Sequence, residues 1–572
     1  MTTEAQGLAL LSQARQALRD GMEGEALAKA RQAAEAFPDS LVVRITLGFA
    51  LSASGLHDHA ERVFEQAREH DPAAVRAYCA RLGALAHEPL LLDARAIHLA
   101  HDFARRRACD WRSPDYLQRF AEWIEGAPAR ASRGERLERG LTFHALALGL
   151  PLPLLQRVNR AVTDSIRQQL DPPAPPPEVP RRVGPLRLGY LSHNFGQHPT
   201  AYLTQDLYGL HDRSRFSVHG FALDADDGGP LRRKIAGACD HWVDAHGLHP
   251  RDVAQRIREH GIDVLVAMGG YQTGPVIDVC LYRPAPVQVN YLAFQATLGC
   301  PEVAYHITDR QCTLPHESPW WDEALVCLGD THFVYPYRQA IAPRPARADE
   351  GLPDEALVLC GFNNGYKIEP GVFTVWCELL RRVPHAVLWI YQSHPQQGEN
   401  LRRALAGAGI EPNRLVVSRF EADPARHLAR LALADLFIDT FTYSAHTTML
   451  DALYAGVPPV SVAGTTTVGR LGASFVRAAG LPENVCADGD AYVQRVLHLA
   501  GDAGERGRQR QHLRRIREQQ QGPFDIPRRT RELEGAYDEM WRQYRAGVAP
   551  RGFDADAAGV AALGESPFTT GP

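Results

Sequence analysis

Hydrophobic positions change their spacing along the chain near residue 185. Residues 1 to about 170 carry Ala and Leu three or four positions apart among Arg and Glu, and this period predicts one helix after another. From residue 187 to about 545, short apolar, often β-branched runs alternate with helical segments. Runs that are apolar on both faces are typical of parallel sheets covered on both sides, so this region is predicted to be α/β.

The α/β region is predicted to form two Rossmann-like halves, 187–345 and 346–545, divided by a loose stretch near 340–352. About 360 residues exceed what one such sheet holds. Ligands of open α/β sheets bind at the carboxyl ends of the strands, so we expect a cleft lined by the loops that follow them. The predicted strands are 186–192, 216–223, 264–268, 287–294, 356–362, 386–393, 414–420, 436–440 and 458–464.

The helical region contains an internal repeat. A shift of 34 positions aligns Gly21 with Gly55, Ala26 with Ala60, Ala30 with Phe64, Ala33 with Ala67 and Pro38 with Pro72. This spacing resembles the tetratricopeptide repeat, in which small residues let two antiparallel helices approach and a proline ends the second helix. A helical bundle with coincident alanines is the alternative. We expect residues 1–170 to form a repeat array with a concave face for peptides, degenerate after residue 75.

The connecting and terminal segments differ in composition from these domains. Residues 171–186 are rich in proline and are predicted to be a semi-rigid linker. Residues 546–572 are predicted to be a flexible tail. If the donor site lies in the second half, deletion of residues 1–170 is expected to spare nucleotide binding and to impair transfer to protein.

Composition narrows the class of protein. The 572 residues carry a formal net charge of -5, which gives no electrostatic reason to expect a nucleic-acid partner. Ten cysteines are scattered without a CxxC pair, as suits a reducing compartment. No stretch approaches the roughly 18 apolar residues of a membrane span, and the N-terminus lacks the pattern of a signal peptide. We expect a cytoplasmic protein without a membrane partner.

The segment 433–464 places polar groups between a buried strand and a helix. His446, Thr447 and Thr448 fall at the predicted helix N-terminus, where free N–H groups and the helix dipole favour an anion such as a phosphate. Asp451 lies one turn further, on roughly the same face, where a carboxylate could accept hydrogen bonds from ribose hydroxyls. The alternative is an ordinary N-cap followed by an acidic first turn.

Two other segments carry candidate chemistry. Lys367 follows the predicted strand 356–362 and the polar loop that contains Asn364, and a lysine there suits the neutralisation of a leaving diphosphate. A solvated loop lysine is the alternative. His427 and Arg430 share one face of a short helix and could hold a nucleobase and a phosphate, or could be surface charge.

His198 belongs to a polar loop, 193–200, that follows the first predicted strand of the α/β region. Either this loop is a plain turn, or it brings His198 to the mouth of the cleft, close to acceptor and donor. The sequence has no GxGxxG, Walker or HExxH motif, and no metal site is predicted.

Together, YKIEP (366–370), HTT at 446–448 with Asp451, LYRPAPVQVNYLAF (281–294) and GQHPT (196–200) resemble the O-linked N-acetylglucosamine transferase family, glycosyltransferase family 41. The resemblance spans nearly the whole chain and is that of a bacterial homologue. It implies tetratricopeptide repeats followed by a two-domain GT-B fold. It also implies inverting, metal-independent transfer of N-acetylglucosamine from UDP-GlcNAc to serine or threonine of a polypeptide, which the repeats and the cleft would bind.

The resemblance also implies residue roles. His198 matches a histidine discussed as a catalytic base, and Lys367 matches the lysine at the donor diphosphate. Asn364 stands where animal members have glutamine. The remaining donor-binding matches are the base-binding pair His427 and Arg430, and the segment His446, Thr447, Thr448 and Asp451 for diphosphate and ribose.

Two departures from the family leave the donor open. No lysine stands near 422–424, where the family contacts uridine, and the loop 293–300 differs from that of animal members. A related GT-B enzyme with another donor such as GDP-fucose is therefore one alternative. A repeat-based protein-binding scaffold with a weakly active catalytic domain is the other.

Overall fold

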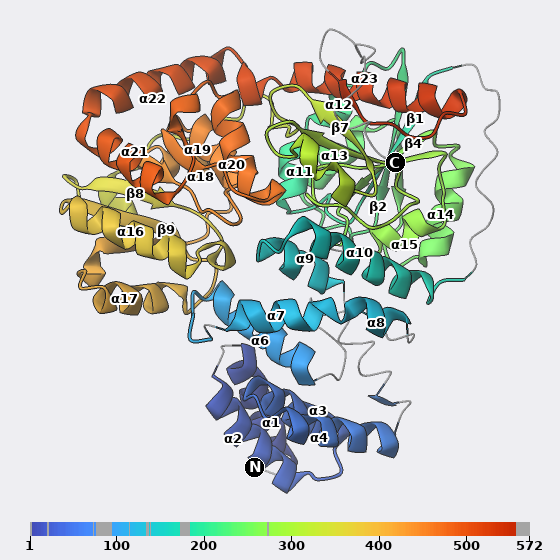
Figure 1. The fold of residues 1–572 in the computed structure, drawn as a ribbon, viewed down its shortest axis with the longest axis vertical. Coiled ribbons are helices and arrows are strands. Elements are labelled where there is room, and N and C mark those ends of the chain that lie inside the picture. The colour runs from blue at the N-terminus through green and yellow to red at the C-terminus, as the bar shows by residue number, and fades with distance from the viewer. Residues whose placement is uncertain are drawn as a thin grey trace.

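The computed structural model describes residues 3–19, 22–71, 74–75, 94–113, 115–132, 137, 139–171, 184–271 and 274–555. In these ranges a helical domain lies beneath two α/β units that stand side by side (Figure 1). This arrangement confirms the predicted fold of helical repeats followed by two Rossmann-like halves. Most of the predicted linker, residues 172–183, lies outside the described residues.

The first four helices are two repeat units: α1 (Thr3–Arg19), α2 (Glu23–Ala36), α3 (Leu41–Ala53) and α4 (His57–His70). Helices α2 and α4 begin and end 34 residues apart, which is the period of the sequence repeat. The aligned alanines of α2 and α4 are buried. A Cβ on Gly48 would lie 2.1 Å from the ring of Phe64, so the small residue is what lets α3 and α4 approach.

The later helices belong to a different core: α6 (Ala94–Arg107), α7 (Tyr116–Glu125), α8 (Ala127–Ser132), α9 (Gly140–Ala147) and α10 (Leu152–Arg167). Buried residues of α10 such as Leu155 and Val162 share one hydrophobic cluster with Leu265, Phe294 and Leu298 of the first half. The predicted boundary at residue 170 therefore divides one core. The apolar face of α10 is covered by the first half, whereas the small clusters of α1–α4 consist almost wholly of repeat residues.

The first half holds an eight-stranded parallel sheet in the order β14-β7-β6-β5-β4-β1-β2-β3 among the described residues. Its strands are β1 (Leu186–Ser192), β2 (Phe216–Ala222), β3 (His241–Asp244), β4 (Val264–Met268), β5 (Val287–Asn290), β6 (Tyr305–Asp309), β7 (Ala324–Leu328) and β14 (Phe553–Ala555). Its helices are α11 (Pro199–Thr204), α12 (Leu207–Leu210), α13 (Pro230–Ala238), α14 (Pro250–Glu259) and α15 (Val276–Leu281).

The second half holds a six-stranded parallel sheet in the order β10-β9-β8-β11-β12-β13 among the described residues. Its strands are β8 (Leu357–Gly361), β9 (Ala386–Tyr391), β10 (Leu415–Ser418), β11 (Leu436–Ile438), β12 (Pro459–Val462) and β13 (Val485–Cys486). Its helices are α16 (Pro370–Arg382), α17 (Gln397–Gly407), α18 (Pro424–Leu431), α19 (Thr447–Tyr454), α20 (Thr467–Ala478), α21 (Gly489–Gly501) and α22 (Ala503–Glu518). A short 3₁₀ turn, η3 (Gly365–Lys367), follows β8.

Each sheet reverses its direction of winding at one place. In the first sheet the chain goes from β1 outward through β2 and β3 and then returns to the other side of β1 as β4. In the second sheet it goes from β8 through β9 and β10 and returns beside β8 as β11. Loops diverge at such a switch point, which is where open α/β sheets bind ligands. The loops after β1, β8 and β11 are therefore the ones expected to carry the site.

The C-terminal segment returns to the first half. Helix α23 (Ile526–Arg545) lies over the first sheet in Figure 1, and its Tyr537 packs in the core there with Tyr190. Strand β14 then pairs with β7. The structure differs here from two expectations: α23 does not stay with the second half, and residues 553–555 of the predicted tail are sheet. Without β14, strand β7 would be the exposed edge of the sheet, and β14 covers it. This pairing joins residues far apart in the sequence, so no local sequence signal predicts it.

Polar side chains tie the two halves together. Arg470 of α20 donates to both carboxylate oxygens of Glu317 at 2.7 and 2.6 Å and to the carbonyl of Cys312 at 2.8 Å. Ser474, one turn on, donates to Asp309 at 3.2 Å. In the ranges described, no helix is both long and apolar enough to cross a membrane, and the cysteines there form no disulfide.

Candidate functional site

Lys367 lies in the loop after β8, where it reaches the loop after β11. Its Nζ donates to the carbonyl of Ser444 at 2.9 Å and stands 4.3 Å from the centre of the Tyr443 ring. The two loops at the switch point of the second sheet thus meet at this ammonium. The sequence predicted that Lys367 follows a strand, and the structure adds Tyr443 and Ser444 as its partners.

The N-terminus of α19 is open beside this lysine. His446 occupies the N-cap position but makes no side-chain cap, and the first helical bonds from Met449 and Leu450 return to its carbonyl. The half-buried Thr447 and Thr448 form the first turn, and their N–H groups precede those bonds. The ring of His446 stacks on that of Tyr443, with the ring centres 4.7 Å apart. Lys367, a helix N-terminus and two hydroxyls converge there, which suits a diphosphate.

Burial sets the electrostatics of this group. Loss of water lowers the pKa of Lys367 to about 7, against the opposing effect of the Asp439 carboxylate. Burial raises the pKa of Asp439 to about 6, although hydrogen bonds from Ser461 and backbone N–H groups act the other way. Burial also lowers the pKa of His446 well below its usual range. An anion beside Lys367 would favour its protonated form.

Asp451 joins the two halves. Its Oδ1 accepts from the hydroxyl of Tyr335 at 2.7 Å and from that of Tyr202 at 3.4 Å. Its Oδ2 lies 3.7 Å from Nε2 of His427. Tyr202 belongs to α11, the helix that His198 caps, so Asp451 touches the same helix as the candidate catalytic histidine. Sequence reasoning missed both tyrosines, because both contacts are long-range.

His427 and Arg430 are in contact but differ in exposure. Arg430 is buried, and its Nη1 donates to the Ser418 hydroxyl at 2.9 Å and to the Arg419 carbonyl at 2.7 Å. Its Nη2 lies 3.2 Å from Nδ1 of His427. Because a guanidinium can only donate, Nδ1 accepts and Nε2 carries the imidazole proton, directed toward Asp451. The geometry gives Arg430 the task of orienting His427.

Asn364 lies in the same loop as Lys367, residues 362–369 between β8 and α16, which we call the diphosphate loop. Its carbonyl accepts from the N–H of Lys367 at 2.9 Å, which closes the turn η3. Its side-chain Oδ1 is buried without a hydrogen-bond partner in the part of the chain that the structure describes. A buried acceptor of this kind costs free energy unless a bound molecule donates to it.

His198 caps α11 at the carboxyl end of β1. Its Nδ1 accepts from the N–H of Thr200 at 3.1 Å, so a neutral imidazole carries its proton on Nε2. Burial lowers the pKa of His198 to about 4, although Asp224 acts in the opposite direction. The free nitrogen is therefore a hydrogen-bond donor rather than a proton acceptor. The structure places His198 at the switch point of the first sheet, and helix α11 connects it to Asp451 of the second half.

Groups that could hold a metal ion lie elsewhere among the described residues. One consists of Asp309, Cys312 and His332, which are buried, and the other lies on α21 and α22. In the first, Nδ1 of His332 is already 2.6 Å from Asp309. Neither group includes a candidate donor-site residue, and the metal-free character of the site stays a prediction.

Comparisons of the chain with family models and with curated proteins agree on one family. The family model described as Glycosyl transferase family 41 matches residues 171–345 and 342–533. A probable UDP-N-acetylglucosamine--peptide N-acetylglucosaminyltransferase, SEC, of Arabidopsis thaliana is 31% identical over 463 residues, covering 78% of this chain and 47% of its own length. The corresponding Caenorhabditis elegans enzyme is 26% identical, covering 64% of this chain and 41% of its own. The chain spans about half the length of the curated relatives it matches.

A solved structure is similar over almost its entire length. A mutant of the O-GlcNAc transferase of Thermobaculum terrenum superposes with a TM-score of 0.70 at 26% identity. The match covers 96% of this chain and 99% of that one.

Proposed function

This chain belongs to glycosyl transferase family 41, and on that premise we propose that it is an inverting protein O-glycosyltransferase, transferring N-acetylglucosamine from UDP-GlcNAc to serine or threonine hydroxyls of polypeptides. The observation that carries the proposal is the meeting of Lys367 with the open N-terminus of α19 at the switch point of the second sheet. The names of the Arabidopsis and Thermobaculum relatives support the choice of reaction.

In this reaction the acceptor oxygen forms a bond to the anomeric carbon as the bond to the diphosphate breaks. The acceptor hydroxyl loses its proton, which is released together with UDP, and UDP leaves with the electron pair of the broken bond. The negative charge that develops on the diphosphate meets Lys367 and the N–H groups and hydroxyls of Thr447 and Thr448. These groups take the place that a divalent cation has in other glycosyltransferases, so we propose that no metal is required.

The nucleoside would lie over α18 and α19. His427 has a proton on Nε2 and is half-buried, so it can donate to a base or a ribose, while Arg430 holds it in place. Asp451 keeps Oδ2 for a ribose hydroxyl while Tyr335 and Tyr202 occupy Oδ1. Asn364 offers its unpartnered Oδ1 to an N–H of the donor.

His198 would act on the side of the sugar and the acceptor. With Nδ1 used to cap α11, its Nε2–H can donate to a sugar or peptide oxygen. We assign it a positioning role in transfer. The base for the acceptor proton is then another group.

The acceptor and the compartment follow from the same family assignment. The repeats α1–α4 would recruit a polypeptide, which reaches the sugar between the two halves. No nucleic acid or membrane takes part in this proposal, and the protein would work in the cytoplasm.

One observation favours a different sugar donor in place of UDP-GlcNAc. The segment 422–424 reads Ala-Asp-Pro, without the lysine that would contact uridine. GDP-fucose is the alternative donor, and a scaffold with weak catalysis is the alternative function.

A donor screen tests the proposal. UDP-GlcNAc, UDP-glucose and GDP-fucose are each incubated with the full chain and a mixture of acceptor proteins, and nucleotide release and the mass of the acceptors are measured. We expect release of UDP and addition of N-acetylhexosamine to serine or threonine. Transfer from GDP-fucose would replace the donor assignment. Nucleotide binding without transfer from any donor would favour the scaffold.

A further inference from the structure

The end of helix α6 touches the diphosphate loop directly. A Cβ on Gly365 would lie 1.9 Å from the carbonyl oxygen of Arg107, so glycine is what permits this approach. The thiol of Cys109 lies 3.5 Å from the carbonyl of Gly365, and Nδ2 of Asn400 on α17 donates to the carbonyl of Ala108 at 3.0 Å. The last turn of α6 is thus clamped onto the loop that carries Lys367.

An aromatic ladder continues this contact to the α19 N-terminus. Its five rings follow one another with centroids 3.8, 6.1, 5.7 and 4.7 Å apart: His144, Phe103, Tyr366, Tyr443 and His446. The first belongs to α9 and the second to α6, and the remaining three belong to the two switch-point loops. The ammonium of Lys367 stands over the fourth ring. Rings in such contact interdigitate as in a protein core, so a change in one shifts its neighbours.

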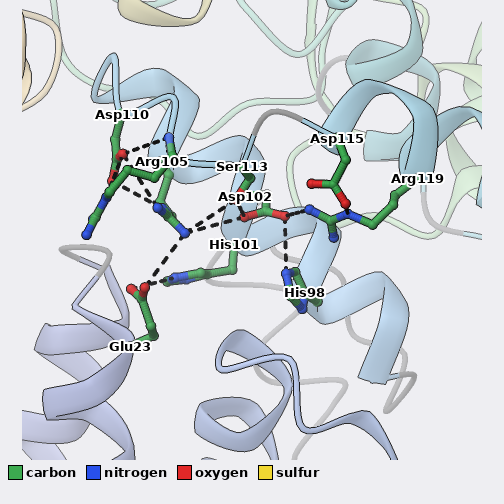
Figure 2. A network of polar contacts seen from close by, with 10 residues as sticks. Glu23, His98, His101, Asp102, Arg105, Asp110, Ser113, Asp115 and Arg119 are labelled. Atoms are coloured by element: carbon green, nitrogen blue, oxygen red, sulfur yellow. Dashed lines mark hydrogen bonds and ion pairs between the residues drawn. The ribbon is translucent and has the colours of Figure 1, made fainter. Parts of the chain in front are cut away.

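A buried polar network fixes α6 on its other side (Figure 2). Asp102 accepts from Arg119 at 2.7 Å and from Ser113 at 2.9 Å, and lies 3.2 Å from His98. Burial alone would raise the pKa of Asp102, but these partners lower it to about 2. Arg105 binds Asp110 at 3.1 Å and lies 3.7 Å from Glu23 of the first repeat. These paired charges hold α6 in one position relative to α7 and the repeats.

We propose that α6 is a positioning element of the donor site: through Phe103 and the contact of Arg107 with Gly365 it sets the place of Lys367. The inference rests on the proposed function of Lys367 at the diphosphate. It makes part of the helical domain a structural component of the nucleotide-sugar site. Neither the repeat motif nor the strand pattern suggests this role.

The protonation of Lys367 reports its surroundings independently of activity. The ammonium faces Asp439, Tyr443 and His446 from the β11–α19 side, and the adjacent Tyr366 in turn lies near Arg107 of α6. The sequence contains only three lysines, Lys29, Lys234 and Lys367, so a lysine-specific label gives few signals. Displacement of the ladder would admit water, and the pKa of Lys367 would rise from about 7 toward the usual lysine value.

The experiment compares Phe103→Leu with Phe64→Leu in the full chain. Phe64 is a buried ring on α4 that shares a cluster with Ile97 on the repeat side of α6 but stands outside the ladder, so its variant controls for the loss of a buried ring next to α6. Each lysine is labelled with ¹³C-methyl groups, Lys367 is assigned through Lys367→Arg, and its pKa is read by NMR titration alongside turnover. We expect Phe103→Leu to raise the pKa of Lys367 and to reduce turnover about tenfold, since small misplacement of a catalytic group has large effects on rate. Phe64→Leu should change neither.

Asn400→Ala provides a milder test if Phe103→Leu does not fold. It removes one hydrogen bond to the end of α6 and should shift the lysine pKa and the rate in the same directions by less. The inference would be overturned if folded Phe103→Leu or Asn400→Ala had the same pKa of Lys367 and the same turnover as Phe64→Leu. A wild-type chain that transfers no sugar would refute the proposed function instead, while the titration would still report whether α6 sets the place of Lys367.

Discussion

One ring nitrogen of His198 caps helix α11, and the other is free to bind a substrate group. Its Nδ1 accepts from Thr200, and burial holds its pKa near 4, so the free Nε2 carries the proton around pH 7. A group in this state can orient an oxygen by donating to it, but it has no lone pair free to take a proton. The expected consequence of its loss is therefore the loss of a hydrogen bond and not of a base.

His198→Ala should accordingly reduce transfer only moderately, by about tenfold or less, because a general base would be worth about 10²–10⁴-fold. His198→Asn is the matched variant, since asparagine can also cap α11 and keeps an N–H donor, and it should retain more activity. Steady-state kinetics with UDP affinity measured by calorimetry give the comparison. A loss above a hundredfold at unchanged UDP affinity would restore the role of base.

Lys367→Ala should cut kcat/KM by about 10²–10³-fold, the usual cost of removing one group that stabilises a developing negative charge. In the wild type, kcat/KM should fall as pH rises through about 7, because the free enzyme loses the Lys367 proton there. The fall in kcat should come at higher pH, since a bound diphosphate favours the protonated lysine. The alanine variant should lack this alkaline fall. Activity within twofold of wild type would reject the assignment.

The residue types of the site were predictable from the sequence, but their hydrogen bonds were not. Arg430 has the residue type of a phosphate ligand, yet its guanidinium is used on Ser418, Arg419 and His427. His198 was placed at the end of a strand, but its tautomer depends on the N–H of Thr200. Periodicity assigns a residue to a face or a loop, whereas the direction of a hydrogen bond depends on the folded backbone around it.

At the scale of elements, hydrophobic runs identified nine strands, and all nine are present, with ends that differ by a few residues. Strand β3 was missed because it is short and largely exposed, and β6 because it buries His306 and Asp309 among its apolar residues. Strands β13 and β14 were missed because runs of two and three residues do not stand out from loops, whereas β7 is as long and as apolar as β4 and was overlooked. Strand order was not predictable from the runs, and it is the order that puts the loops after β8 and β11 side by side. The donor site is thus a product of topology.

Asp451→Asn should weaken UDP binding by about tenfold or more, because hydrogen bonds to a charged group contribute about 1.5–3 kcal/mol. Tyr335→Phe should weaken it less, since it frees Oδ1 without removing the acceptor for ribose. Calorimetric titration with UDP and with uracil separates the ribose from the base. An equal loss for both ligands would mean that Asp451 supports the fold of α19 and does not contact ribose.

The domains of the whole molecule are divided at a different place from the boundary that the sequence pattern predicted. Apolar residues recur three or four positions apart both before and after residue 75, although the 34-residue repeat does not continue. The sequence therefore predicted one helical domain from 1 to 170. The structure assigns α6–α10 to the core of the first half and to the diphosphate loop. The expectation that a chain lacking residues 1–170 keeps nucleotide binding is therefore revised: that deletion would expose the apolar surface on which α10 lies.

Chelation should leave the full enzyme active. The donor site supplies a lysine and a helix N-terminus for the diphosphate, so transfer rates with and without EDTA should agree within about twofold. The rate is measured after dialysis against chelator and again after Mg²⁺ or Mn²⁺ is added back. A strict requirement for either ion would contradict the diphosphate assignment of Lys367 and α19.

Deletion of residues 1–71 should separate recruitment from chemistry. It removes α1–α4, whose clusters are nearly self-contained, and leaves α6 with Asp102, Arg105, Asp110 and Arg119 in place. The loss of Glu23 breaks two contacts of that network, with Arg105 and with His101, and Ile97 becomes exposed. The shortened chain should fold, bind UDP with nearly wild-type affinity and hydrolyse UDP-GlcNAc or transfer its sugar to short peptides.

Transfer from this deletion variant to folded proteins should fall, because their recruitment needs the repeats. Circular dichroism establishes the fold first, and calorimetry and mass spectrometry follow. A folded deletion variant that modifies proteins as fast as the full chain would show that α1–α4 do not recruit the acceptor. Loss of UDP binding in a folded variant would instead extend the positioning role of α6 to the repeats, because Glu23 connects them to its charged network.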